Sequence, residues 1–174
     1  MATNPAAGHR DAFGAANLVA KIAAATGGSQ DLGEEAVARL LAERGAEGIV
    51  VCGRNAANGE RVAAETSAAG CFTGFVKADL AGVAQCRTVS AGTDRRFGRL
   101  DVLVNAAGLD DRSNIFDSNE ERYDVIMDVN IRAPLFLIQE AVNTMRREKI
   151  EGSIVNIQSK SGPANHRWSR EASQ

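Results

Sequence analysis

The sequence predicts an α/β fold in which a doubly wound parallel sheet lies between two layers of helices, a three-layer α/β/α arrangement. Short apolar runs alternate along the chain with amphipathic segments of roughly 10–15 residues, which is typical of successive strand–helix–strand units. The apolar runs are continuous, as in residues 48–52 (GIVVC), so we expect strands that are covered by helices on both faces. A length of 174 residues fits a single domain.

Five strands and five helices follow from these patterns. The expected strands are residues 21–26, 48–52, 72–78, 101–105 and 153–157. The expected helices are residues 34–44, 56–68, 82–97, 118–129 and 131–148. We assign residues 1–174 to one domain, with a loose arm over residues 1–15 and an irregular tail over residues 160–174.

Each element has a local signal of its own. The first strand ends in glycines, and the first helix has its apolar residues at helical spacing. The second and third helices are followed by Gly70 and Gly98, while the fourth and fifth strands (DVLVN and SIVNI) are short apolar runs. The last helix is apolar every three or four residues from Ile131 to Met145, and Pro134 falls in its first turn, where proline is tolerated.

Composition excludes several classes of function. Lys and Arg number 20 against 22 Asp and Glu, and this balance gives no positive excess for binding nucleic acid. No apolar run reaches the roughly 18 residues that a membrane span needs. Three cysteines without a CxxC spacing and two distant histidines, His9 and His166, predict no disulfide framework and no metal site. We therefore expect a cytoplasmic protein without a metal.

A glycine-rich turn follows the first strand and precedes the first helix. Such a turn lets the backbone approach a pyrophosphate, which the amide groups of the helix N-terminus then bind. Glycines at the end of a strand can also serve only the turn itself. The candidate cofactor-binding residues in this turn are Thr26, Gly27, Gly28, Ser29, Gln30, Leu32 and Gly33.

The second strand ends in Arg54 and Asn55, which we also assign to cofactor binding. In dinucleotide-binding folds an acidic residue near this place accepts from the ribose 2′-hydroxyl, whereas an arginine suits a 2′-phosphate. The acidic residue is absent and Arg54 is present, so the sequence favours NADP(H) over NAD(H). A surface arginine at a strand end is the alternative.

At this point the chain resembles the short-chain dehydrogenase/reductase family, which has a Rossmann-like fold, over about residues 13–162. The resemblance rests on five elements in the family's order. They are the turn with Thr26, Gly27 and Gly33; Asp79 and Leu80 in KADL; Asn105, Ala106, Ala107 and Gly108; Asn130 in MDVNIRAP; and Ser159 in IVNIQS.

The resemblance implies a role for each of these residues. Asp79 would contact adenine, Asn130 would order a water, and Ser159 would polarise a substrate carbonyl. The residues themselves leave other interpretations open. Asn105 can close the turn after its strand, Asn130 can cap or kink a helix junction, and Ser159 can be an ordinary loop residue.

Two departures from the family set limits on this expectation. The middle glycine of the family's turn is Asp31 here, and its carboxylate would repel a pyrophosphate. Asp31 can also form a capping pair with Glu34 at the helix start, but this would not remove the repulsion. The family's catalytic tyrosine would fall at Ala172, and the lysine that follows it would lie past Gln174. Tyr123, the only tyrosine, precedes the site. We therefore expect a chain that is truncated before the family's YxxxK motif, C-terminally incomplete in its fold and catalytically incomplete.

Three functions remain in competition. The first is an NAD(P)(H)-dependent oxidoreductase that acts on a small alcohol or carbonyl. The second is a non-catalytic nucleotide-binding fragment or pseudoenzyme. The third is an interaction protein, because the resemblance implies a homo-oligomer through helix 131–148. We expect exposed apolar surface on this helix, which bears Phe136, Leu137 and Ile138.

Overall fold

The computed structural model describes residues 17–27, 33–110 and 116–157. The expected arm over residues 1–15 and the expected tail over residues 160–174 lie outside these ranges. In the described chain the strands are β1 (Ile22–Thr26), β2 (Gly48–Gly53), β3 (Phe72–Lys77), β4 (Val102–Asn105) and β5 (Ser153–Asn156). The helices are α1 (Gly33–Glu43), α2 (Ala56–Ala68), α3 (Val83–Phe97), α4 (Glu120–Met127), η1 (Asp128–Arg132) and α5 (Ala133–Arg147).

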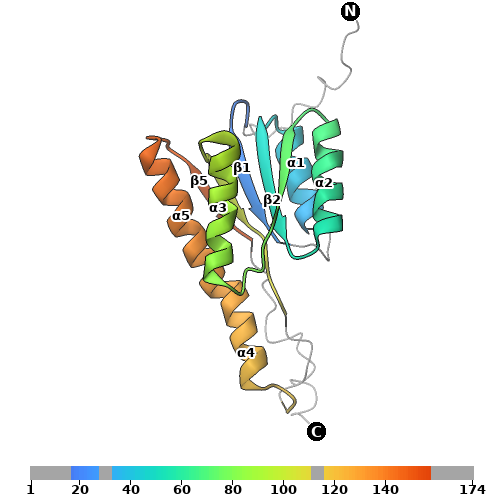
Figure 1. Cartoon of the computed structure of the whole chain (residues 1–174), viewed down its shortest axis with the longest axis vertical. Helices are drawn as coiled ribbons and strands as arrows, with labels where there is room; N and C mark the ends of the chain where they lie inside the picture. The colour runs from blue at the N-terminus through green and yellow to red at the C-terminus, as the bar shows by residue number, and fades with distance from the viewer. Residues whose placement is uncertain (1–16, 28–32, 111–115, 158–174) are drawn as a thin grey trace, which may run out of the picture.

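The five described strands form one parallel sheet in the order β3-β2-β1-β4-β5. Helices α1 and α2 lie on one face, and α3 and α5 lie on the other (Figure 1). The predicted doubly wound, Rossmann-like fold is therefore confirmed, and each expected element agrees with an observed one to within two residues at either end.

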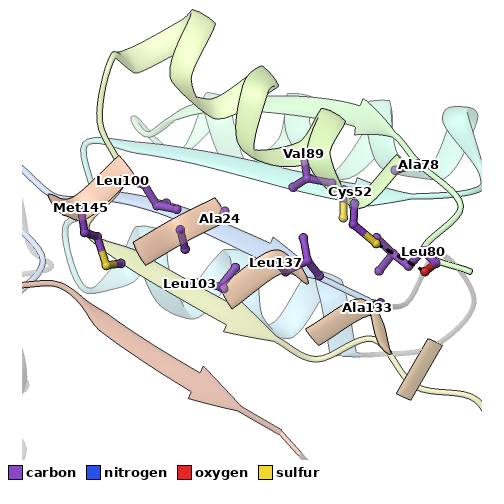
Figure 2. Close-up of a cluster of buried hydrophobic side chains, with 12 residues drawn as sticks. Ala24, Cys52, Ala78, Leu80, Val89, Leu100, Leu103, Ala133, Leu137 and Met145 are labelled. Atoms are coloured by element: carbon purple, nitrogen blue, oxygen red, sulfur yellow. Dashed lines mark hydrogen bonds between the residues drawn. The ribbon is translucent and has the colours of Figure 1, made fainter. Parts of the chain in front are cut away.

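The central strand β1 separates two hydrophobic cores. Ala23 and Ala25 face α1 and α2, where they pack with Ile49 and Val51 of β2. Ala24 faces the opposite way and packs with α3 and α5, among side chains that include Leu103 and Leu137 (Figure 2). Successive strand residues point to opposite faces, so the small side chains of β1 allow both helix layers to approach the middle of the sheet.

Local signals in the sequence account for several helix ends. The side chain of Asn55 accepts a hydrogen bond from the Asn58 backbone and caps the start of α2, and Asn119 caps α4 in the same way. Gly98 ends α3 in the left-handed conformation, with φ at 69°.

The junction between α4 and α5 differs from the prediction of two separate helices. The two run into each other through η1, a single π-helical turn in which the Ala133 amide donates to the Asp128 carbonyl, five residues back. Pro134 explains this widened turn, because it has no amide to donate and its ring would clash with the Asn130 carbonyl in a regular α-helix.

The expected apolar surface on helix 131–148 is present, but Phe136, Leu137 and Ile138 do not form it. Leu137 is only 1% exposed, and its two neighbours are half-buried against the core between α3, α5 and the sheet. The exposed apolar side chains of this region are instead Ile131 and Leu135, which lie on the helix surface away from that core. The helix is amphipathic, and Leu137 lies on the face that packs on the sheet.

Candidate functional site

The candidate site lies at the carboxyl ends of β1 and β4, where the strand order reverses. Thr26 and Asn105 are the last residues of these two strands and are directly paired in the sheet. In open parallel sheets the loops that leave two such strands diverge to opposite faces, and ligands bind in the crevice between them. This edge carries most of the residues that the sequence singled out.

Gly27 brings the loop after β1 against the loop after β4. Its φ of 108° lies in the region that favours glycine. A Cβ atom at this position would overlap the backbone of Ala106 and Ala107, so no larger residue fits without moving one of the loops. Ala107 is itself half-buried, whereas Gly108 is exposed.

Two buried polar atoms at this edge lack hydrogen-bond partners among the described residues. They are the Thr26 hydroxyl oxygen and the Asn105 Oδ1 atom. The Asn105 amide nitrogen, in contrast, donates to Asn156 Oδ1 of β5 at 2.9 Å. An unpaired buried polar atom costs about 1–3 kcal/mol, so two of them side by side fit a place that a polar ligand or its ordered waters complete.

Asn130 ties the π turn to the segment that follows Gly108. Its Oδ1 atom accepts from the Leu109 amide at 2.8 Å, and its Nδ2 atom donates to the Leu109 carbonyl at 2.7 Å. The side chain therefore holds the loop after β4 in place, a contact that neither interpretation of the sequence included. A carboxamide retains one further lone pair and one further N–H, which leaves capacity to bind a water as well.

Asp79 occupies the turn between β3 and α3. Its Oδ1 atom accepts from the Ala81 amide at 3.1 Å, and its own amide donates to Gln85 Oε1 at 2.7 Å. The Oδ2 atom makes no hydrogen bond to any described residue and so has both lone pairs for a ligand. Leu80 is buried in the core beside Cys86, whose thiol pKa is raised by burial.

Arg54 and Asn55 follow β2 at the same edge of the sheet. Arg54 is exposed, whereas the Asn55 side chain serves as the cap of α2. Gly33 begins α1. Four further predicted cofactor residues (Gly28, Ser29, Gln30 and Leu32), together with Asp31 and Ser159, lie outside the described residues.

Sequence reasoning missed three residues that contribute to this edge: Leu109, Arg132 and Asn156. Asn156 could have been found, since it ends the fifth strand as Asn105 ends the fourth. The Arg132 side chain contacts the backbone of Ala81, and the backbone of Leu109 contacts the Asn130 side chain. The partners are distant in the chain, and no sequence pattern signals contacts with backbone groups. Leu109 also lines a cleft of about 320 Å³ between this loop and α4.

Other candidate chemistry finds little support among the described residues. Tyr123 is 61% exposed on α4. The described part of the chain holds no group of three or more potential metal ligands. Within the same ranges, none of the helices is both long and apolar enough to cross a bilayer.

The parallel sheet, its switch point and the glycine turn define a Rossmann-like domain. Comparison with known proteins then identifies the family. The family model described as short chain dehydrogenase matches residues 21–170. The chain therefore belongs to the short-chain dehydrogenase family.

Individual relatives and solved structures agree with this assignment. An uncharacterised oxidoreductase of Methylorubrum extorquens is 36% identical over 142 residues, which make up 82% of this chain and 56% of that protein. Galactitol 2-dehydrogenase of Agrobacterium fabrum is 33% identical over 144 residues, 82% of this chain and 54% of that protein. The chain thus spans little more than half the length of these relatives.

Among solved structures, a metagenomic short-chain oxidoreductase in complex with NADP is similar with a TM-score of 0.74. Its sequence is 31% identical, and the match covers 84% of this chain and 65% of that one. A short-chain dehydrogenase/reductase from Serratia marcescens matches with a TM-score of 0.73 at 31% identity, over 83% of this chain and 57% of that one.

Proposed function

We propose that the carboxyl edge of the sheet binds a nicotinamide dinucleotide, as part of an oxidoreductase that interconverts an alcohol and a carbonyl compound. The observation that carries this proposal is the contact of Gly27 with Ala106 and Ala107, beside the unpaired atoms of Thr26 and Asn105. A glycine with positive φ at the end of the first strand is what a pyrophosphate-binding turn requires. The NADP complex of a structural relative supports the same cofactor class.

Each residue at the edge has a proposed part in binding. Arg54 would hold a 2′-phosphate, which would make NADP(H) the preferred cofactor over NAD(H). The Oδ2 atom of Asp79, which has no hydrogen bond from any described residue, would accept from adenine. Asn130 would keep the loop after β4 in place and order a water, and Ser159 would polarise the substrate carbonyl. The bound nicotinamide would donate or accept the hydride.

For the 174-residue chain we propose cofactor binding without turnover. The reaction needs a proton donor close to the carbonyl, with a pKa near the working pH. Tyr123 is the only tyrosine of the sequence, and its exposed position on α4 does not suit that role. The alternative function is therefore a nucleotide-binding fragment or pseudoenzyme.

Calorimetric titration of the folded chain with NADPH and NADH tests this proposal. We expect saturable binding of both, tighter for NADPH. Arg54→Gln should weaken NADPH binding by about tenfold or more and leave NADH binding nearly unchanged, because only the 2′-phosphate loses its charged partner. Arg95→Gln, on an exposed position of α3, is the matched control.

The outcomes separate the parts of the proposal. A folded chain that binds neither dinucleotide refutes the cofactor site. If NADPH and NADH bind with equal affinity and Arg54→Gln changes neither affinity, only the NADP(H) preference is refuted. Oxidation of NADPH in the presence of aldehydes or ketones, abolished by Ser159→Ala, would refute the absence of turnover.

We also propose that the chain self-associates through the surface of helix 131–148. Exposed apolar side chains recur every four residues along α4, η1 and α5, at Tyr123, Met127, Ile131 and Leu135. Ile131 and Leu135 belong to the proposed surface, and Tyr123 and Met127 extend it along α4. Exposed apolar side chains that gather on one surface mark sites of protein interaction. The small-molecule substrate and this second copy are the partners we propose.

A further inference from the structure

We propose that Arg132 is a positioning residue for the adenine half of the cofactor, which it supports through the turn that carries Asp79. This inference rests on the proposed cofactor site. Arg132 lies in η1, fifty-three positions along the chain from Asp79, and no motif discussed above assigns it a role.

The contact runs from the guanidinium group to a backbone carbonyl. Arg132 Nη2 donates to the carbonyl oxygen of Ala81 at 2.9 Å and to Asp128 Oδ2 at 2.6 Å. Asp128 lies one turn earlier in the same helical segment, so the ion pair holds the arginine side chain extended towards Ala81. A hydrogen bond with one charged partner is stronger than a neutral one.

Ala81 is in turn held by Asp79. The Ala81 amide donates to Asp79 Oδ1 at 3.1 Å, and its carbonyl accepts from Arg132. One residue is therefore fixed on both sides of its Cα atom, by the proposed adenine ligand and by the arginine. Without Arg132 the peptide between Ala81 and Gly82 would be held only by the hydrogen bond from the Gly82 amide to the Asp79 carbonyl, and the carboxylate that depends on the Ala81 amide would sample more orientations.

The π turn lets one short segment hold two loops of the site. Asn130 binds the backbone of Leu109 after β4, and Arg132 binds the backbone of Ala81 after β3. A π turn closes its backbone hydrogen bond over five residues instead of four, which changes the directions in which successive side chains leave the helix. The loop after β3 and the loop after β4 are therefore both held by the same helical segment.

A second arginine of the same helix provides a matched control. Arg147 donates to Asp94 at 2.6 Å and to the Gly98 carbonyl at 3.3 Å. It joins the C-terminal ends of α5 and α3, whereas Arg132 acts beside their N-terminal ends. Both arginines are about half exposed and combine ion pairing with one carbonyl contact; Arg132 pairs with Asp128, and Arg147 pairs with Asp94 and Glu148. Only Arg132 touches a loop of the site.

The test compares binding of NADPH and of adenosine 2′,5′-bisphosphate, a probe for the adenine half alone. Arg132→Ala should weaken both ligands by a similar factor of about three to ten, because the lost preorganisation concerns the adenine half. Arg132→Lys, which can reach one of the two acceptors, should recover part of the affinity. Arg147→Ala should leave both affinities unchanged while it lowers thermal stability.

A double-mutant cycle shows whether Arg132 acts through Asp79. In an Asp79→Ala background, Arg132→Ala should change the affinity for adenosine 2′,5′-bisphosphate less than twofold, because the effect of Arg132 is transmitted by Asp79. A change of about twofold is the margin within which mutational effects can be compared. The same factor in both backgrounds, an unchanged affinity in Arg132→Ala, or an equal loss in Arg147→Ala would overturn the inference. If Arg132→Ala does not fold, Arg132→Met, which keeps the aliphatic part of the side chain and loses both contacts, would overturn it when it binds with wild-type affinity.

These outcomes are distinct from failure of the proposed function. A wild-type chain that is folded and binds neither ligand refutes the cofactor site, and the role of Arg132 with it. A wild-type chain that binds both ligands, together with any of the overturning results above, refutes the role of Arg132 alone.

Discussion

At the scale of single residues, Gly27 joins the loops of two strands that are far apart in the sequence. It combines a positive φ with direct backbone contact on Ala106 and Ala107. The sequence indicated a glycine because a pyrophosphate must approach the turn. The structure shows that the turn is also limited from the other side, by the loop after β4.

Replacing Gly27 by alanine separates the effect of its positive φ from the effect of its contact with Ala106 and Ala107. We expect Gly27→Ala to lower the free energy of unfolding by about 1–3 kcal/mol beyond the backbone penalty, because the new methyl group overlaps backbone atoms. Gly70→Ala is the matched control, since Gly70 has a φ of 96° and nothing within 4 Å of the added Cβ. Urea denaturation of both variants measures the difference; equal losses would show that only the dihedral angle matters.

At the scale of elements, α5 presents two different apolar faces. Leu137 is buried among α3 and the sheet, whereas Leu135 is 62% exposed. Periodicity in the sequence located the helix but did not tell which apolar residues face the sheet, because both sets recur every three or four residues. The π turn adds to this difficulty, since it shifts the phase of α5 relative to α4.

A charge on the exposed face tests self-association. Leu135→Glu should keep the circular dichroism spectrum and shift the chain to a smaller apparent mass in size-exclusion chromatography, because a carboxylate cannot be buried unpaired in an apolar interface. Ala64→Glu, on an exposed position of α2 at the opposite face of the sheet, is the control. Identical elution of the wild type and Leu135→Glu would contradict the proposed interface.

At the scale of the whole molecule, Asp101 joins three strands at the edge opposite the site. Its buried carboxylate accepts from Arg99 at 2.6 and 2.9 Å, from the Ile22 amide at 3.0 Å and from Lys21 at 3.3 Å. Its backbone carbonyl also accepts from the Ser153 amide at the start of β5. Burial alone would raise the pKa of Asp101, but the hydrogen bonds from Arg99, Ile22 and Lys21 outweigh it and lower the pKa.

This lowered pKa predicts a loss of stability in acid. A carboxyl group whose pKa is lower in the folded state stabilises the fold above its unfolded pKa of about 3.9, and this contribution is lost as the pH falls through the folded value. Asp101→Asn should therefore lower the free energy of unfolding at pH 7 by about 1–3 kcal/mol, a range set by hydrogen bonds to charged groups. Below pH 4 the variant and the wild type should converge.

Urea denaturation between pH 7 and pH 3 measures this convergence. Asp94→Asn is the control, because the pKa of Asp94 is also lowered, by its hydrogen bond with Arg147, but the pair lies on the surface. Its loss at pH 7 should be smaller, since exposed ion pairs are screened by water. A constant difference between Asp101→Asn and the wild type over the whole pH range would contradict the role of this carboxylate.

The sequence alone determined the order, type and approximate ends of the elements, and with them the parallel sheet. Continuous apolar runs, helical spacing and glycine stops are local signals, and local signals suffice when each element agrees with its neighbours. It also singled out Thr26, Gly27, Asp79 and Asn105, and the parallel sheet brings the carboxyl ends of their strands to one edge.

Only the tertiary structure decided how that edge is held together. The contacts of Asn130 with Leu109, of Arg132 with Ala81 and of Asn105 with Asn156 join residues between 21 and 51 positions apart. Two of them involve backbone groups, which every residue carries and no sequence pattern marks. The burial of Leu137 instead of its neighbours likewise depends on how α5 is rotated about its axis relative to the sheet, which the preceding π turn changes.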